Sequence, residues 1–476
     1  MKKLRIIRIL LAAVTFAVSW CAVWFIPKTA PFFTTQFGSS ALEVLSEISL
    51  GAVFAVVSIT IITLLAGRVY CSVLCPLGIM QDIMAAGKRK YRFLPRTRPV
   101  KYLIFIIFAA MIATAFMLPW TILMPSAHFV QIVNYGFREV CFRMGISETS
   151  SNAAVTTMIT AWTVFIILLI LARWKGRIYC NSLCPVGTIL GVFARFALYR
   201  VKIGKDKCVS CGACEKICKS SCIDAKNKLV NNEDCVMCMN CLSQCKFDAL
   251  KITACQNKEP SMPSRREFIA GSAALAGGVA AGIVLGKTPV PDKKVIMPPG
   301  AMDFDRFSSA CIGCGLCISA CSGDILTPSV TAYGLRGFMM PHIDYSKGEC
   351  RFSCNRCMTI CPCGALKPLE LKEKQSLRIG IARYTPALCV AYDAGEDCGA
   401  CAEHCPVGAL TMVPYKDTTI PQVNDKLCIG CGACQHICPV IPIKAITIEG
   451  IPNQSFVEKP EAAEAVKLDA EEDFPF

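Results

Sequence analysis

Histidine is scarce in this chain, with four residues among 476, and the motifs that bind several common cofactors are missing. No CxxCH pair is present to attach a haem c, no Walker loop to hold nucleotide phosphates, and no GxGxxG fingerprint follows a strand. The sequence therefore gives no support for haem c, ATP or dinucleotide chemistry. Two kinds of residue are abundant instead: there are 33 cysteines, and apolar residues make up 54% of the chain.

Most of the cysteines fall into six groups of four. Short-spaced cysteines in a long chain indicate metal ligation, because disulfide frameworks belong to small secreted domains. The spacing CxxCxxCxxxC is that of bacterial ferredoxins, in which three cysteines bind one [4Fe-4S] cluster and the fourth binds its neighbour. The six quartets are Cys208, Cys211, Cys214 and Cys218; Cys235, Cys238, Cys241 and Cys245; Cys311, Cys314, Cys317 and Cys321; Cys350, Cys354, Cys357 and Cys361; Cys389, Cys398, Cys401 and Cys405; and Cys428, Cys431, Cys434 and Cys438.

Four of the quartets have this spacing, whereas the two that begin at Cys350 and Cys389 have a longer first gap and keep CxxCxxxCP. Together they predict six [4Fe-4S] clusters, with these 24 cysteines as the iron ligands. In the first two quartets we expect an exchange of the fourth ligand, so that Cys245 completes the first cluster and Cys218 the second. Cys222 is an alternative to Cys218. Zinc is the competing metal, but it normally uses separated CxxC pairs, which leaves the third cysteine of each run unexplained. Among the last four quartets the pairing of the fourth ligand stays open.

The first 200 residues contain four apolar runs, at 6–26, 44–66, 102–123 and 153–172. Each is near the ~20 residues that cross a bilayer as a helix, and buried helices of a soluble core are the alternative. Basic residues before the first run and between the second and third indicate that these stretches are cytoplasmic. Much of the net charge of +15 thus reflects topology and affinity for anionic membrane lipid, not for nucleic acid.

A twelve-residue motif occurs twice in this apolar part, as GRVYCSVLCPLG at 67–78 and as GRIYCNSLCPVG at 176–187. Each copy holds a CxxxCP pair, Cys71 with Cys75 and Cys180 with Cys184. On one helical turn both thiols of a pair would face the same way, and pseudo-symmetry could bring all four sulfurs together. We expect redox or metal chemistry at these thiols. The alternative is that the motif only shapes a re-entrant turn of the chain.

Between the second and third quartets lies the stretch SRREFIAGSAALAGGVAAGIVLG, which starts at Ser264. Its paired residues Arg265 and Arg266 and its weakly apolar tail are typical of a twin-arginine export signal, and we expect the tail to remain as a fifth span. The alternatives are an ordinary helix anchored by two basic residues, or a segment that does not cross the membrane.

These features predict a multi-domain membrane protein. We expect a four-span domain at 1–202, a two-cluster ferredoxin domain at 203–258, the signal or fifth transmembrane helix at 264–287, a four-cluster ferredoxin domain at 288–455 and an acidic tail at 456–476. The ferredoxin domains should be of the α+β bacterial type. Residues 203–258 should be cytoplasmic, and 288–476 should lie on the periplasmic side of a bacterial inner membrane.

On these motifs, residues 1–256 resemble NapH, a four-span membrane ferredoxin with two CxxxCP motifs, and residues 260–450 resemble NapG, a twin-arginine-exported four-cluster ferredoxin. A similar pair is MauN and MauM. The resemblance implies electron transfer from the quinone pool to an exported oxidoreductase, with the twin-arginine machinery as a further partner and a quinol dehydrogenase component as the possible activity. Quinol also suits the topology, because ~30 Å of hydrocarbon separates the two sets of clusters. The alternative is a maturation factor that reduces a metal or thiol site of a client enzyme.

Overall fold

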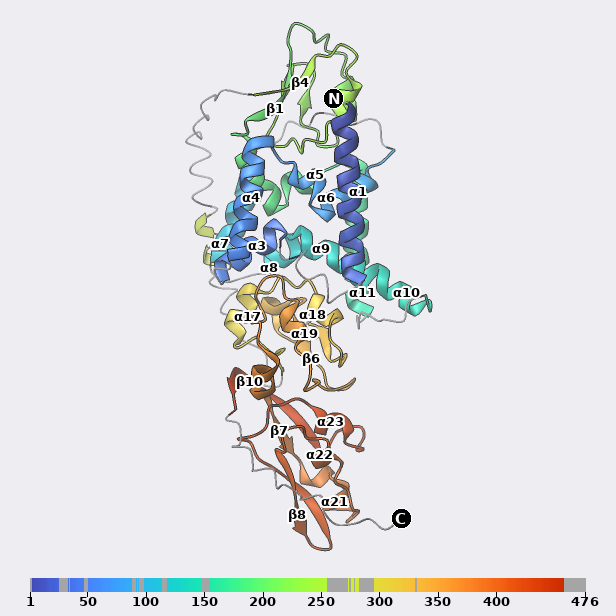
Figure 1. The fold of residues 1–476 in the computed structure, drawn as a ribbon, viewed down its shortest axis with the longest axis vertical. Helices are drawn as coiled ribbons and strands as arrows, with labels where there is room; N and C mark the ends of the chain where they lie inside the picture. The colour runs from blue at the N-terminus through green and yellow to red at the C-terminus, as the bar shows by residue number, and fades with distance from the viewer. Residues whose placement is uncertain are drawn as a thin grey trace, which may run out of the picture.

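The computed structural model describes residues 2–24, 33, 35–46, 50–87, 91, 93, 98–113, 118–146, 155–254, 273, 275–277, 279–281, 295–329 and 332–457. The molecule is elongated (Figure 1). The helical part, residues 2–198, lies between two smaller parts of the molecule. The domain at 199–254, which we call the central domain because of its place in the sequence, covers one end of the helical part, and a C-terminal domain at 295–457 extends from the other end.

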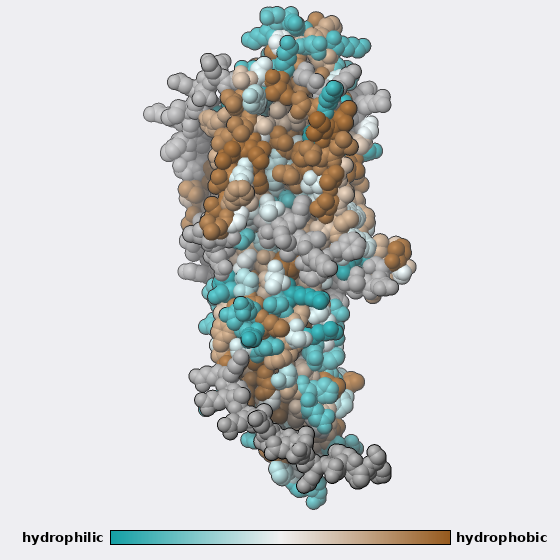
Figure 2. Space-filling view, viewed as in Figure 1, coloured by the Kyte–Doolittle hydropathy of each residue, from teal (hydrophilic) through white to brown (hydrophobic). Residues whose placement is uncertain are grey.

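Apolar sequence determines the helical part. Its elements are α1 (Lys2–Trp24), α3 (Phe37–Ser46), α4 (Leu50–Ala66), α5 (Tyr70–Val73), α6 (Pro76–Met84), α7 (Arg98–Ala113), α8 (Leu118–Leu123), α9 (Pro125–Gln131), the π-helix η1 (Ile132–Arg138), α10 (Glu139–Arg143), α11 (Val155–Lys175), α12 (Ile178–Ser182) and α13 (Pro185–Ala194). Large apolar side chains point outward from it: Leu50 is 88% and Phe54 74% exposed. Figure 2 shows this apolar surface as a brown band below the polar end of the molecule.

Two described helices are long and apolar enough to cross a membrane, within Lys3–Trp24 and Thr157–Lys175. The other two expected runs each contain residues outside the described part of the chain, 47–49 in the second and 114–117 in the third. Their apolar helices, including Leu50–Ala66 and Lys101–Met111, are shorter. Most of the expected fifth span at 264–287 lies outside the described residues. The four-span domain and the fifth span therefore stay predictions.

The central domain is a small α+β unit. Strand β1 (Tyr199–Ile203) pairs antiparallel with β4 (Leu250–Ala254), and between them come α14 (Ala213–Ile217), β2 (Ile223–Asp224), β3 (Leu229–Val230) and α15 (Asn240–Gln244). The domain thus begins at Tyr199, four residues before the expected boundary. Its buried core is small and includes cysteines alongside Val201, Ile223 and Leu250. A core of this size gains much of its stability from whatever the cysteines bind.

The C-terminal domain repeats short helices and two-stranded sheets. Its elements are α17 (Phe304–Ala310), α18 (Leu316–Ser319), β5 (Leu326–Pro328), η2 (Gly334–Gly337), β6 (Pro341–Ile343), α19 (Arg356–Thr359), α20 (Leu371–Ser376), β7 (Leu377–Tyr384), η3 (Pro386–Leu388), α21 (Val390–Asp393), α22 (Ala400–Glu403), β8 (Leu410–Tyr415), β9 (Thr418–Val423), α23 (Ala433–Ile437) and β10 (Ile446–Phe456). Antiparallel pairs form between β5 and β6, β7 and β10, and β8 and β9.

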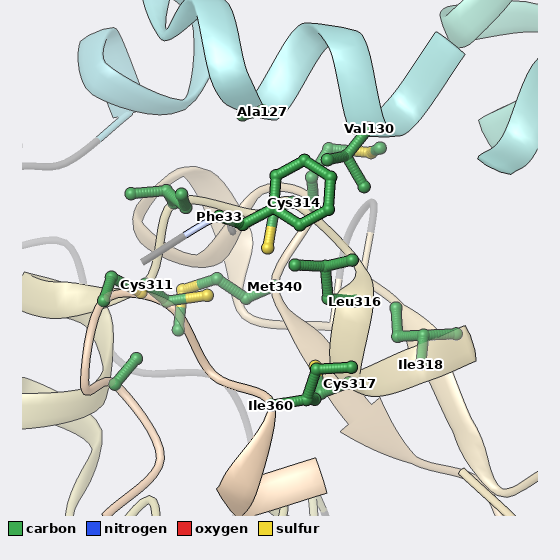
Figure 3. Packing of buried hydrophobic residues seen from close by; sticks show 14 of the residues in the cluster. Phe33, Ala127, Val130, Cys311, Cys314, Leu316, Cys317, Ile318, Met340 and Ile360 are labelled. Carbon is green, nitrogen blue, oxygen red and sulfur yellow. The ribbon is translucent and has the colours of Figure 1, made fainter. Parts of the chain in front are cut away.

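One buried core runs from the helical part into the C-terminal domain. Figure 3 shows Ala127 and Val130 of α9 above Phe33, Cys314 and Met340. All five side chains are buried in the same cluster. The C-terminal domain is therefore packed on the end of the helical part through shared apolar contacts.

Candidate iron-sulfur sites

The structure brings the first predicted cluster set together in the central domain. Cys208, Cys211 and Cys214 line a cavity of about 360 Å³ with Cys245, the cysteine expected to complete this site. Cys211 is exposed, so this site lies near the protein surface. The arrangement agrees with the exchange of fourth ligands that the spacing predicts.

The second set contains one cysteine more than a cluster needs. Cys235, Cys238 and Cys241 line a cavity of about 340 Å³ with both Cys218 and Cys222. The Sγ atoms of Cys218 and Cys222 lie 3.5 Å apart, and a hydrogen bond from the Cys222 thiol lowers the pKa of Cys218 to about 7. Both thiols therefore reach the site.

The backbone of each CxxCxxC loop turns twice through the left-handed region. In the last loop Gly430 and Gly432 have φ of 72° and 82°, and in the second loop Met237 and Met239 take the same places at 52° and 62°. For residues other than glycine this conformation costs roughly 1–2 kcal/mol. The second loop keeps this shape against its local preference, as expected of backbone at a functional site.

Neighbouring quartets in the C-terminal domain also exchange their last cysteines. Cys321 lines a cavity of about 330 Å³ with Cys350, Cys354 and Cys357. In return, Cys361 is an electrostatic neighbour of all three remaining thiols of the first quartet, Cys311, Cys314 and Cys317. Burial in this apolar setting raises the pKa of Cys314 to about 12. Thiols in such a place need a metal to become thiolates at neutral pH.

The remaining two quartets show the same exchange. Cys405 joins Cys428, Cys431 and Cys434 around a cavity of about 320 Å³. Cys389 and Cys438 share a small buried cluster against which Cys398 packs, and Cys401 is an electrostatic neighbour of Cys389 and Cys398. The structure thus gives a pairing for the four quartets that the sequence left open.

The order of these sites in space differs from their order in the sequence. Within the C-terminal domain, the first quartet, which begins at Cys311, lies against the helical part, where Gln131 Nε2 donates to the Gly313 carbonyl at 2.8 Å. The second quartet contacts the fourth through a 2.8 Å hydrogen bond from the Cys350 amide to the Cys431 carbonyl. Buried Tyr345 also lies between these two, with its hydroxyl donating to the Gly430 carbonyl. The third quartet, around α21 and α22, is farthest from the helices (Figure 1).

The CxxxCP pairs do not lie on one continuous helix turn, so that expectation was wrong. Cys71 is in α5, whereas Cys75 is extended, with φ −78° and ψ 112°, and caps the new helix α6. Cys184 is extended in the same way before α13. The reason is the proline that follows, because it disfavours helical backbone in the preceding residue and is well suited to the first position of a helix. All four thiols of the two pairs are nevertheless buried in the same core.

Two fully buried arginines join the halves of the repeat in a reciprocal way. Arg68 of the first copy donates to the Cys180 carbonyl of the second at 3.1 Å, and Arg177 of the second copy donates to the Cys71 carbonyl of the first at 2.6 Å. Gly78 and Gly187 lie against the same two carbonyl oxygens, and neither position has room for a side chain, because a Cβ atom there would overlap the oxygen. Neither arginine was among the residues predicted from the motif, although they occupy the same position in its two copies.

Acidic residues connect the helical part to the central domain. Asp82 forms ion pairs with Arg177 at 2.7 Å and with Lys219 at 3.6 Å, while Glu233 pairs with Lys101 at 2.9 Å. Lys219 directly follows Cys218, and Glu233 precedes Cys235 by two residues. The second cluster set is thereby held over the CxxxCP repeat.

Within the part of the chain that the structure describes, no group of three or more His, Cys, Asp or Glu side chains is arranged around a single metal ion. This holds for the six quartets and for the four CxxxCP thiols alike.

Three sequence families match the chain. Models described as 4Fe-4S binding domains match residues 48–93 with 155–206, and 205–225 with 308–331; a 4Fe-4S dicluster domain matches 396–441. The fold and the cysteine sites thus define an iron-sulfur protein with several ferredoxin-type domains.

Three curated relatives narrow this class. The ferredoxin-type protein NapG of Escherichia coli is 31% identical over 37% of this chain and 80% of its own length. The methylamine utilization ferredoxin-type protein MauM of Methylobacillus flagellatus is 32% identical over 35% of this chain and 73% of its own length. The ferredoxin-type protein NapF of Escherichia coli is 33% identical over 32% of this chain and 84% of its own length. No solved structure matches. The chain belongs to the Nap and Mau family of ferredoxin-type iron-sulfur electron-transfer proteins.

Proposed function

We propose that this protein is anchored in a membrane, takes electrons from quinol and passes them to an exported oxidoreductase. The observation that carries the proposal is the placement of the C-terminal domain. Its first quartet packs on the helical part, and the other three lead away from it along the length of the molecule (Figure 1). Such a row suits one-electron transfer outward from the helices.

The contact between the helices and the first quartet is specific. Gln131 of α9 holds the Gly313 carbonyl, and Tyr135 of the π-helix η1 packs on Gly315, both within the loop CIGCGLC. Asn134 donates to Ser319 Oγ in the helix that follows. π-Helices are rare in proteins, and those that do occur are often found at functional sites. Electrons leaving the apolar part of the molecule would therefore enter at this quartet.

The outward apolar surface of the helical part supports two parts of the proposal, the membrane anchoring and the use of quinol as a mobile electron carrier. Leu50 and Phe54 on α4 and Ile159 and Ile170 on α11 are all more than half exposed. A surface of this kind on helices is stable in lipid, where quinol is also confined. A bilayer around it would put ~30 Å of hydrocarbon between the central and C-terminal domains, a gap that a mobile two-electron carrier can serve.

The cysteines that line common pockets support an assignment of the cluster ligands. Three cysteines of each quartet would bind one [4Fe-4S] cluster, and the fourth would come from the adjacent quartet, through the pairs Cys218 and Cys245, Cys321 and Cys361, and Cys405 and Cys438. The clusters supply single-electron redox chemistry. The protein orders them, buries them and sets which one faces the helices.

The test is reduction by quinol in anaerobic membranes that contain the full chain. Menaquinol or ubiquinol should give the low-temperature EPR signal of reduced clusters, and Cys314→Ser, which breaks the cluster nearest the helices, should suppress the reduction of the others in the C-terminal domain. The matched variant Cys211→Ser, at the exposed site of the central domain, should not. If neither quinol reduces any cluster, and deletion of the chain impairs metal loading of a client enzyme, the maturation function replaces this one.

A further inference from the structure

Two cysteines outside the six quartets are buried beside a proposed fourth ligand. Cys222 is 3% and Cys363 2% exposed. The Sγ atom of Cys222 lies 3.5 Å from that of Cys218, and the Sγ atom of Cys363 lies 3.8 Å from that of Cys361. Cys218 and Cys361 would each complete the cluster of a neighbouring quartet. At two cluster sites, therefore, two thiols lie at the place of one ligand.

The backbone brings Cys222 back to the second site of the central domain. The Ser221 amide donates to the Cys218 carbonyl at 2.9 Å, and Ser221 has a φ of 51°, a left-handed conformation that costs roughly 1–2 kcal/mol in a residue with a side chain. The Cys222 carbonyl then accepts from the Asn231 amide at 2.8 Å. Cys222 lines the same cavity as Cys218 and the three other cysteines of this site. The strained turn thus places a fifth thiol at a site for four.

Cys363 is held next to Cys361 by an arginine from the adjacent quartet. The Arg306 guanidinium donates to the carbonyls of Gly364 at 2.9 Å and Ala365 at 3.0 Å, the two residues that follow Cys363. Arg306 belongs to α17, the helix that leads into the first quartet of the C-terminal domain. The turn that carries Cys363 is therefore fastened to the quartet whose cluster Cys361 would complete.

The two sites with an additional thiol share a place in the molecule, because both lie against the helical part. Lys219 fastens one of them to this part, and Gln131 binds the other. Three further sites have a cavity among the described residues, and four cysteines line each of these cavities. The additional thiol is thus found at the two sites next to the helices and at none of those three.

We infer that Cys218 and Cys222, and likewise Cys361 and Cys363, are interchangeable fourth ligands, so that either thiol of a pair can hold its cluster. In an exchange, the iron–sulfur bond to one cysteine breaks and the bond to the other forms, while the proton of the incoming thiol passes to the outgoing thiolate. No electron is gained or lost. The inference rests on the proposed cluster ligands, and it is independent of whether quinol is the electron donor.

The test counts iron and acid-labile sulfide in full-length variants purified anaerobically in detergent, and records the EPR spectrum of their reduced clusters. Alanine is the substitute, because a serine oxygen could itself bind iron. Cys218→Ala and Cys222→Ala should each keep the wild-type content, whereas the double variant should lose one cluster, or about four iron atoms. The matched control Cys245→Ala removes the fourth ligand of a site with only four cysteines and should lose a cluster as a single change.

The C-terminal pair repeats the test at an independent site. Cys361→Ala and Cys363→Ala should each keep the wild-type content, and the double variant should lose one cluster. Cys405→Ala is the matched single change, because four cysteines line its cavity.

Three results would overturn the inference. The first is loss of a cluster from Cys218→Ala or Cys361→Ala alone, which would leave the neighbouring thiol as a hydrogen-bond donor only. The second is a Cys218→Ala chain that fails to accumulate where Cys245→Ala accumulates, since Cys222 should have kept the cluster in place. The third is full iron content in Cys245→Ala, because a second thiol would then not be needed for retention. A wild type without iron and sulfide would instead refute the proposed cluster ligands themselves.

Discussion

The hydroxyl of Tyr135 should tune the cluster nearest the helices. It is fully buried, has no hydrogen-bond partner among the described residues, and packs so closely on Gly315 that a Cβ atom there would overlap it. Its electrostatic neighbours are Cys311, Cys314 and Cys317. A buried polar group without a partner costs about 1–3 kcal/mol. We therefore expect the hydroxyl to donate to a sulfur of the bound cluster.

Tyr135→Phe removes this donor and leaves the ring. A net hydrogen bond contributes about 1 kcal/mol, and 1.4 kcal/mol corresponds to about 59 mV for a one-electron couple. The donor stabilises the more negative reduced cluster, so the reduction potential of this cluster should fall by about 40 mV in the variant. The measurement is a redox titration of the purified full chain followed by EPR.

Tyr333→Phe is the matched control. Tyr333 is also buried near Cys311, but its hydroxyl already donates to the Pro341 carbonyl at 3.4 Å. Its removal should leave the potential unchanged. An unchanged or higher potential in Tyr135→Phe would refute the hydrogen bond to the cluster. An equal fall in both variants would show that the shift comes from general loosening of the domain.

Three further predictions follow from the sequence and the domain contacts. Arg265→Lys with Arg266→Lys, which lie outside the described residues, keeps the charge but should strand the C-terminal domain in the cytoplasm; digestion of a C-terminal tag by external protease in both wild type and variant would contradict this. Cys238→Ser should remove about four iron atoms per chain, and an unchanged EPR spectrum would count against the assignment. Lys219→Ala should weaken docking of the central domain by about 1–3 kcal/mol and speed its proteolysis, whereas exposed Lys246→Ala should not.

The cluster sites were largely predictable because their signal is local. In four of the six quartets three cysteines lie within seven residues, which is typical of one corner of a cluster, so the grouping of Cys245 with the first set and of Cys218 with the second was expected from the spacing. The break between Cys71 and Cys75 was readable too, since Pro76 should have ended the helix before Cys75. That signal was available and was not used.

The order of the sites could not be predicted, because it rests on contacts far apart in the sequence. Cys350 meets Cys431 across 81 positions, and Tyr345 reaches Gly430 across 85. These contacts place the fourth quartet next to the second and leave the third at the end of the row.

Lys219 shows how a departure from a sequence pattern acquires a meaning only in three dimensions. Ferredoxin quartets usually continue with proline, and here Lys219 and Lys246 take that place after Cys218 and Cys245. Lys219 Nζ donates to the Asp82 carbonyl at 2.9 Å, and its own carbonyl accepts from the Arg177 amide at 2.9 Å. Proline has no side-chain cation and could not make the first contact. Lys246 is exposed, whereas Lys219 fastens the second cysteine set of the central domain to the CxxxCP repeat.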